Sequence, residues 1–171
     1  DEGVRYTFRF KFCICTALAA LGAAVFLSGD RFFVGLYLTG EGSAADAAQV
    51  MDYGIRYLHI MVWGFLPFAL SNAYSSTLRE TGQTVVPMVG GIAAVAINLA
   101  LNYILIFGHL GMPAMGVEGA AVATVVSRFA ELIIVAGWTH LHGKTVPFIV
   151  GACRSLRIPR QLFWSIARKG L

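Results

Sequence analysis

Asn98, Asn102 and Thr124 are polar residues placed at helical spacing inside strongly apolar stretches. Asn98 and Asn102 are four residues apart, so in a helix both side chains project from the same face. Thr124 lies in the next apolar stretch, at an expected depth similar to theirs. Carboxamide and hydroxyl oxygens suit a hard monovalent cation, or they hydrogen-bond to a nearby carboxylate. The alternative is structural, because Asn and Thr commonly hydrogen-bond between membrane helices.

Arg128 and Glu131 are charged residues in the same apolar stretch as Thr124. Each would cost about 2.5 to 3.5 kcal/mol at the centre of a bilayer if it faced lipid. We therefore expect both to face protein or a water-filled cavity. Their spacing allows them to pair with each other. The alternatives are a role in coupling an ion or proton to movement, and pairing with helices outside this chain.

The composition indicates an integral membrane protein. Of 171 residues, 57% are hydrophobic and 13% are charged, against roughly 45 to 50% apolar and about 25% charged in soluble domains. The net charge of +4 does not indicate nucleic acid, because the basic residues lie between apolar runs and are not interleaved with aromatic residues. The lipid bilayer is the expected partner, and nucleic acid is not.

Apolar runs predict an all-α fold, a polytopic integral membrane bundle of about four transmembrane helices. A span needs about 20 apolar residues to cross the roughly 30 Å hydrocarbon core. The stretch 28–57 is too polar to span, and its part 44–53 is expected to form a polar entry to the next helix. The predicted transmembrane part covers residues 1–143, with helices at about 8–28, 55–78, 87–107 and 117–141.

Pro67 lies near the centre of the second predicted helix, where a proline removes a backbone hydrogen bond and kinks the helix. Two interpretations stay open for this residue. It is a transport hinge, or it is a static kink held by packing.

Residues 144–171 are predicted to form a basic amphipathic linker on the cytoplasmic side. Binding to a partner helix or to anionic lipid is an alternative for this segment. The opposite side of the membrane receives only Arg31 and Arg56, so the positive-inside rule places both ends of the chain in the cytoplasm. The other basic residues outside the spans lie in the N-terminal segment, at the turn holding Arg79 and in the tail.

Enzymatic motifs are absent from the sequence. It contains no Ser/His/Asp or Cys/His set, no phosphate-binding loop and no metal motif. Cys13, Cys15 and Cys153 are an odd set without metal-ligand spacing, and we expect them to be free thiols. We therefore expect neither an enzyme nor a metal site.

Three motifs occur in the order LRETGQTVVP, AINLALNYILIFG and GMPAMGVEGAAVATVVSRFAE. In this order they resemble the multidrug and toxic compound extrusion (MATE) family of transporters. The resemblance implies part of a twelve-helix, two-lobe transporter, in which this chain corresponds to helices three to six of the N-terminal lobe. The partners it implies are the missing helices of the same transporter and small cationic or amphipathic substrates.

By resemblance, the protein lies in the plasma (inner) membrane and works as an antiporter with Na⁺ or H⁺ as the coupling ion and no cofactor. Asn98, Asn102 and Thr124 fall where the first-lobe ion network of the family draws on helices five and six. Some members carry Asp where this chain has Asn102, which puts a proton role for this position in doubt. Rival functions are a lipid-linked precursor flippase of the same superfamily and a non-transporting membrane scaffold.

Overall fold

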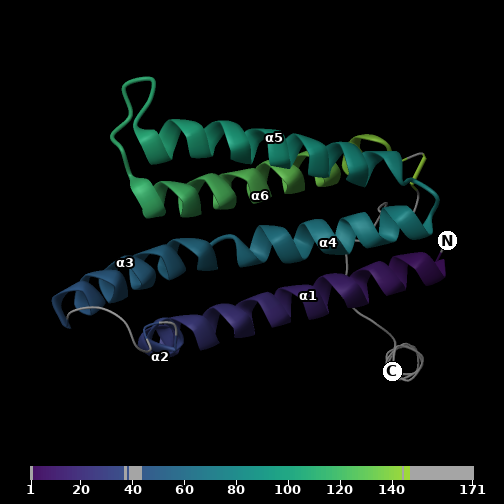
Figure 1. The fold of residues 1–171 in the computed structure, drawn as a ribbon. Helices are drawn as coiled ribbons and strands as arrows, with labels where there is room; N and C mark the ends of the chain where they lie inside the picture. Colours follow the sequence, from purple (N-terminus) through teal and green to yellow (C-terminus); the bar gives the residue numbers. More distant parts are fainter. Residues whose placement is uncertain (1, 37, 39–43, 144, 147–171) are drawn as a thin grey trace.

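Helices form all of the regular structure in the part of the chain that the computed structural model describes, residues 2–36, 38, 44–143 and 145–146. The long helices lie side by side with nearly parallel axes (Figure 1). α5 packs along α6, α1 packs along α4, and α6 also contacts α3 and α4. In chain order the helices are α1 (Glu2–Ser28), α2 (Asp30–Gly35), α3 (Ala44–Val62), α4 (Phe65–Glu80), α5 (Val85–Phe107) and α6 (Gly116–Leu141).

Among the described residues, three helical segments are long and apolar enough to cross a membrane: Gly3–Ser28, Val85–Phe107 and Gly116–Leu141. They coincide closely with the predicted spans 8–28, 87–107 and 117–141. The prediction of an all-α membrane bundle is therefore confirmed. The linker predicted at 144–171 lies, apart from residues 145 and 146, outside the described residues.

The predicted span 55–78 is not one continuous helix. Instead, α3 ends at Val62 and α4 begins at Phe65, with a turn at Trp63 and Gly64 between them. Pro67 gives the physical reason, because it lacks an N–H and its ring would clash with the carbonyl of Trp63 in an unbroken helix. The two helices follow one another end to end (Figure 1). Helical structure also begins earlier than residue 55, because α3 starts at Ala44.

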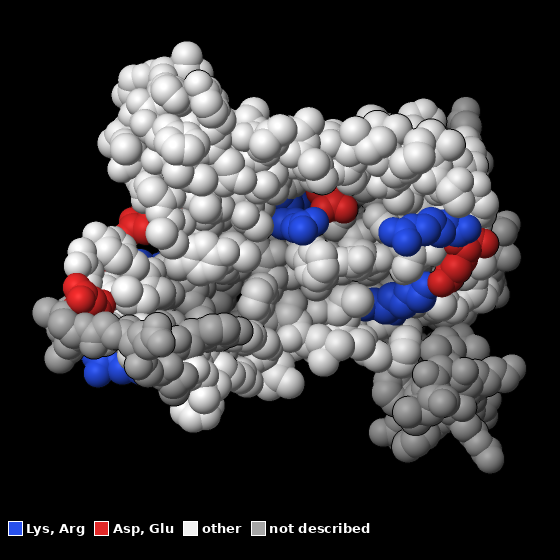
Figure 2. Space-filling model, viewed as in Figure 1, with Lys and Arg blue, Asp and Glu red and all other residues white. Residues whose placement is uncertain are grey.

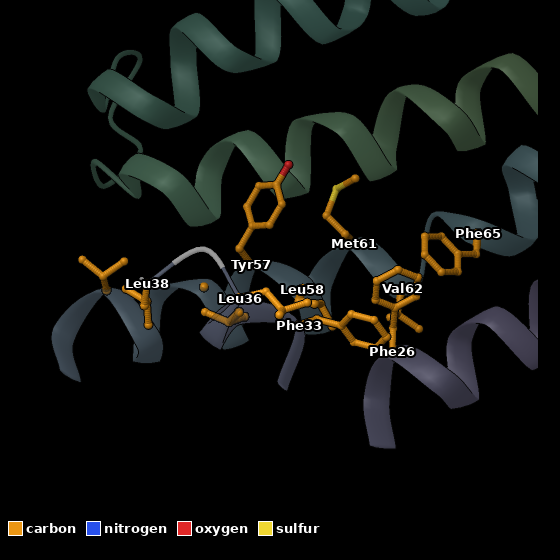
Figure 3. Close-up of a pocket in the computed structure, with 12 residues that line it drawn as sticks. Phe26, Phe33, Leu36, Leu38, Tyr57, Leu58, Met61, Val62 and Phe65 are labelled. Atoms are coloured by element: carbon orange, nitrogen blue, oxygen red, sulfur yellow. The ribbon is translucent and has the colours of Figure 1, made fainter. Parts of the chain in front are cut away.

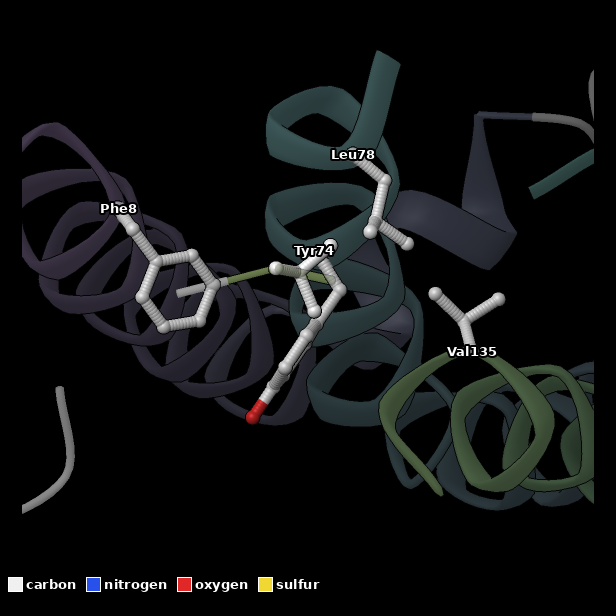
Figure 4. Packing of buried hydrophobic residues seen from close by; sticks show 5 residues of the cluster. Phe8, Tyr74, Leu78 and Val135 are labelled. Carbon is white, nitrogen blue, oxygen red and sulfur yellow. The ribbon is translucent and has the colours of Figure 1, made fainter. Parts of the chain in front are cut away.

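A small core joins α1, α4 and α6 near one end of the bundle. Phe8, Tyr74, Leu78, Val135 and Val146 form its buried cluster, most of which Figure 4 labels. The ring of Phe8 lies edge-on to that of Tyr74, with centroids 5.0 Å apart. The hydroxyl of Tyr74 hydrogen-bonds to Nε2 of His140 at 3.0 Å. This cluster holds the pair α1–α4 against the pair α5–α6, which carries the polar residues.

Two glycines allow α5 and α6 to approach closely. A Cβ atom on Gly119 would lie 2.8 Å from the carbonyl oxygen of Leu105, and one on Gly90 would lie 2.7 Å from Cγ2 of Val135. Backbones approach in this way where small residues face a neighbouring helix. The close packing sets the rotation and the depth of α6 relative to α5, and therefore which polar side chains meet.

Candidate functional site

Asn98 and Asn102 on α5 form a continuous hydrogen-bonded network with Thr124 and Ser127 on α6. Nδ2 of Asn98 donates to Oγ1 of Thr124 at 3.3 Å and lies 3.5 Å from Oγ of Ser127. Nδ2 of Asn102 donates to Oδ1 of Asn98 at 2.9 Å. All four side chains are partly or fully buried. The structure thus brings together the three residues that the sequence placed at one depth.

The two hydroxyl groups on α6 use their protons within the helix. Oγ1 of Thr124 donates to the carbonyl oxygen of Ala120 at 2.9 Å, and Oγ of Ser127 donates to that of Thr124 at 2.7 Å. Each hydroxyl oxygen can still accept hydrogen bonds with its lone pairs. Both therefore present acceptors to α5, and the amide nitrogen of Asn98 meets them.

Oδ1 of Asn102 is an unsatisfied hydrogen-bond acceptor in this network. It is buried, and it has no hydrogen-bond partner among the described residues. A buried polar atom without a partner costs about 1 to 3 kcal/mol. A carbonyl-type oxygen in this position can bind a cation or accept a hydrogen bond from a donor group, and either would remove that cost.

Ser127 was missed by the sequence reasoning as a site residue. It lies one helical turn after Thr124, which places both hydroxyls on the same face of α6. That spacing is the signal that could have identified it. Serine is also a common packing residue in membrane helices, so its type alone does not mark a site.

Arg128 and Glu131 form an ion pair within α6. Nη1 of Arg128 lies 3.0 Å from Oε2 of Glu131, and their side chains are 40% and 17% exposed. The guanidinium carbon of Arg128 also lies 5.0 Å from the centre of the Phe68 ring on α4, a cation–π arrangement. The intrahelical pairing that the spacing allowed is therefore present, and the pair contacts α4 through an aromatic face.

The break between α3 and α4 lies beside these groups. A cavity of about 200 Å³ is lined by Gly64, Phe65 and Phe68 on one side and by Thr124 and Arg128 on the other. Pro67 is buried and occupies the third position of α4. The break between α3 and α4 thus faces the polar residues of α6 across this cavity. A change in the angle between α3 and α4 would therefore alter the surroundings of Thr124 and Arg128.

Charged residues at the other end of the bundle join helices far apart in sequence. Nε2 of His59 on α3 lies 3.0 Å from Oδ2 of Asp30 on α2. Arg56 contacts Asp52 at 2.8 Å and Glu118 on α6 at 3.4 Å. The pairs His59–Asp30 and Arg56–Glu118 were not predicted, because sequence spacing carries no information on contacts between distant segments, whereas Arg56 and Asp52 are four residues apart within α3. Exposed pairs of this kind typically contribute only about 0.2 to 1 kcal/mol each.

A larger cavity of about 600 Å³ lies between α1, α2, α3 and the start of α4 (Figure 3). Aliphatic and aromatic side chains line it, and the rings of Phe26 and Phe33 are 4.8 Å apart. Tyr57 supplies the hydroxyl group of an otherwise apolar lining. The cavity fits an apolar group, because the other described side chains that line it are apolar. The described residues also contain no group of three or more His, Cys, Asp or Glu side chains that could hold a metal.

The fold and the buried polar residues define the class of this chain, an α-helical integral membrane protein with a polar network inside its bundle. The MatE family model matches residues 2–104. The chain therefore belongs to the multidrug and toxic compound extrusion family, as its motifs indicated.

Curated relatives agree with this assignment. The chain is 34% identical over 115 residues to the "Probable multidrug resistance protein NorM" of Thermotoga maritima, which covers 62% of the chain and 24% of that relative. It is 28% identical over 165 residues to the "Probable multidrug resistance protein YoeA" of Bacillus subtilis, covering 96% of the chain and 33% of the relative. The chain thus spans about a quarter to a third of the length of these relatives. No solved structure matched the chain.

Proposed function

We propose that this chain is part of a secondary active efflux transporter that exports cationic or amphipathic drugs in exchange for Na⁺ or H⁺. The observation that carries the proposal is the Asn98–Asn102–Thr124–Ser127 network in a chain of this family. The relatives' names, which describe multidrug resistance proteins, support the substrate class. The mechanism is alternating access between two lobes, of which the described helices form part of one.

Asn102 gives the network its proposed role in coupling. Its unpartnered Oδ1 is a ligand for Na⁺, or an acceptor for a protonated group on a helix outside this chain. Occupation of this position would satisfy a buried acceptor. Because Asn102 is linked through Asn98 to α6, the bound ion would stabilise one arrangement of α5 and α6 over others.

Arg128, Glu131 and Pro67 are proposed to transmit this change. The ion pair lies one turn beyond Thr124 and contacts Phe68 of α4, just after the break at Trp63 and Gly64. A bend at this break would change the packing against Arg128. In the proposed topology both ends of the chain lie in the cytoplasm and the helices cross the inner membrane.

Alanine substitutions in the complete transporter test the assignment of the network. Asn98→Ala and Asn102→Ala should weaken efflux of a cationic dye driven by a Na⁺ or H⁺ gradient. Asn72→Ala is a matched control, because Asn72 is exposed on α4 and, within the described part of the chain, its side chain bonds only to the carbonyl oxygen of Phe68 in its own helix. Unchanged coupling in both network variants would remove the site assignment. Export of a lipid-linked sugar in place of the dye would favour the flippase.

A further inference from the structure

The short helix α2 lies along α3, and two contacts of different kinds hold it there. A Cβ atom at Gly54 of α3 would lie 2.7 Å from Cγ1 of Val34, so α2 approaches α3 closely where the glycine leaves room. At the start of α2, Oδ2 of Asp30 lies 3.0 Å from Nε2 of His59 on α3. The first contact is steric and does not depend on pH. The second joins two groups that can change their charge.

The start of α2 directs the carboxylate of Asp30 toward α3. Asp30 is the first residue of α2 and follows Gly29, where the chain leaves α1. Oδ1 of Asp30 accepts a hydrogen bond from the N–H of Arg31 at 2.6 Å, which leaves Oδ2 to face His59. The local backbone therefore orients the carboxylate for this contact.

The packing of α2 on α3 also forms a wall of the cavity of about 600 Å³ (Figure 3). From α2 the lining includes Phe33, Val34 and Leu36, and from α3 it includes Gly54 and Tyr57. Because α2 supplies this wall, its position on α3 decides whether the described helices enclose the cavity.

The strength of the contact between Asp30 and His59 depends on the charge of the imidazole ring. Histidine is the side chain whose charge commonly changes between about pH 5 and 8, whereas carboxylates normally stay ionised across this range. In the charged imidazole both nitrogens carry protons, so Nε2 of His59 donates to the carboxylate of Asp30 as part of an ion pair. The neutral imidazole keeps one proton, and it either donates a hydrogen bond without the charge or presents a lone pair to the carboxylate. Because charge-assisted hydrogen bonds are roughly twice as strong as neutral ones, the contact is stronger at the acidic end of this range.

The other charged groups near His59 in the described part of the chain are arginines and carboxylates. Arg56 lies one turn before His59 on α3 and pairs with Asp52 and with Glu118 of α6. On α2, Arg31 is the further charged residue. Acidic groups are visible at this end of the bundle, at the left of the space-filling view (Figure 2). Side chains of these types normally stay charged between about pH 5 and 8, so they form a constant background.

Apolar residues make up most of the remaining surroundings of His59 among the described residues. His59 lines a cavity of about 300 Å³ together with Ile60, Trp63 and three valines of α6. The neighbouring stretches 12–28 of α1 and 60–78 of α3 and α4 contain no charged residue and no histidine. In this part of the described chain, His59 is therefore the group whose charge is expected to change between about pH 5 and 8.

We propose that Asp30 and His59 form a pH-sensitive clasp between α2 and α3. The clasp holds α2 in place while His59 is charged. It loosens when the imidazole loses its proton, so the wall that α2 supplies to the larger cavity opens more often at alkaline pH. An ion pair of this exposure changes the ratio of the two arrangements by about two- to five-fold. The inference rests on contacts between described helices, so it depends neither on what the protein transports nor on what covers the bundle.

The mobility of a spin label on α2 in the complete transporter tests the clasp. The label is attached at Phe32→Cys in a background without other cysteines, because Phe32 is 67% exposed and does not line the cavity. Spectra at about pH 5.5 and about pH 8.5, on either side of the range in which histidine titrates, are compared in detergent micelles, where both ends of the bundle meet the same pH. A label at Leu99→Cys on α5 reports any effect of pH on the whole protein.

Three substitutions are each combined with the label on α2. His59→Gln and Asp30→Asn remove the charge from one side of the clasp and keep a side chain of similar size. His142→Gln is the matched control. His142 follows the far end of α6, and its Nδ1 lies 3.0 Å from the carbonyl oxygen of Trp138, one turn earlier.

We expect the ratio of mobile to immobile label on α2 to rise about two- to five-fold from the lower to the higher pH, in the original protein and in His142→Gln. In His59→Gln and Asp30→Asn the ratio should stay high at both pH values, and the label at Leu99 should not respond. A ratio that does not change with pH in the original protein would overturn the proposal. A response that persists in both clasp variants would overturn it as well, because another group would then be the one that titrates.

Discussion

Nδ2 of Asn98 lies 3.3 Å from Oγ1 of Thr124, and this contact joins α5 to α6 through side chains alone. It connects the asparagines of the polar network on α5 to its hydroxyl groups on α6. Because hydrogen bonds between membrane helices contribute only about 0.6 kcal/mol on average, the contact is a weak support for the fold. The same network includes Oδ1 of Asn102, a buried acceptor without a partner among the described residues.

Thr124→Val should reduce stability more than Thr139→Val does. Both threonines donate to the carbonyl oxygen four residues before them, at 2.9 and 2.7 Å, and only Thr124 also accepts from Asn98. We expect a difference of about 0.6 to 1 kcal/mol in the free energy of unfolding. Chemical unfolding in detergent micelles measures it. Equal losses for the two variants would show that the bond to Asn98 contributes nothing.

Gly119→Ala should destabilise the protein, and Gly137→Ala should not. Both glycines lie in α6, so the gain in helix propensity is shared by the two variants. A Cβ atom at Gly119 would meet the backbone carbonyl of Leu105 at 2.8 Å, whereas one at Gly137 meets nothing within 4 Å. Forced separation of helices typically costs about 1 to 3 kcal/mol. Midpoints of thermal unfolding would reveal the contrast, and a similar midpoint for both would contradict the close approach.

Glu131→Gln should impair folding in the membrane more than the double substitution Arg128→Met with Glu131→Gln. The single change leaves the guanidinium of Arg128 without the carboxylate 3.0 Å away, while the double change removes both charges. Yield of folded transporter and its unfolding midpoint are the measurements. If the single variant were as stable as the original, Arg128 would have its main partner outside this chain.

Pro67→Ala should slow efflux, whereas Pro87→Ala should leave it unchanged. Each proline is buried and is the third residue of its helix, Pro67 in α4 and Pro87 in α5. Pro67 lies just after the short break between α3 and α4. Its replacement therefore allows these two helices to join into one continuous, stiffer helix, which the replacement of Pro87 does not. Initial rates of dye efflux at matched expression test the hinge. Equal rates for the two variants would favour a static kink.

Much of the fold could be predicted from the sequence, because long apolar runs leave few alternatives in a membrane. The runs at α1, α5 and α6 exceed the length that a span needs, and the structure places helices there. The region of Pro67 shows the limit of this reasoning. A proline in the sequence predicts a distortion of the helix, but whether the helix bends or ends depends on the residues that pack beside it. Here Gly64, in the turn between α3 and α4, lies against Val125 of α6.

Contacts between distant segments were harder to predict. The pairs Asp30–His59 and Arg56–Glu118 depend on how α2, α3 and α6 meet at one end of the bundle. Nothing in the local spacing of these residues indicates a partner. Ser127 differs, since its spacing from Thr124 was visible in the sequence and only its bond to Asn98 needed the structure.

The sequence by itself determined the membrane class, the family motifs and the helix face on which each polar residue lies, because helical periodicity relates neighbours along one segment. Only the tertiary structure decided that Asn98 meets Thr124 and Ser127, that Oδ1 of Asn102 is left without a partner, and that Asp30 meets His59. These features depend on the rotation and depth of one helix against another. Close packing sets both, above all where Gly119 admits the backbone of Leu105.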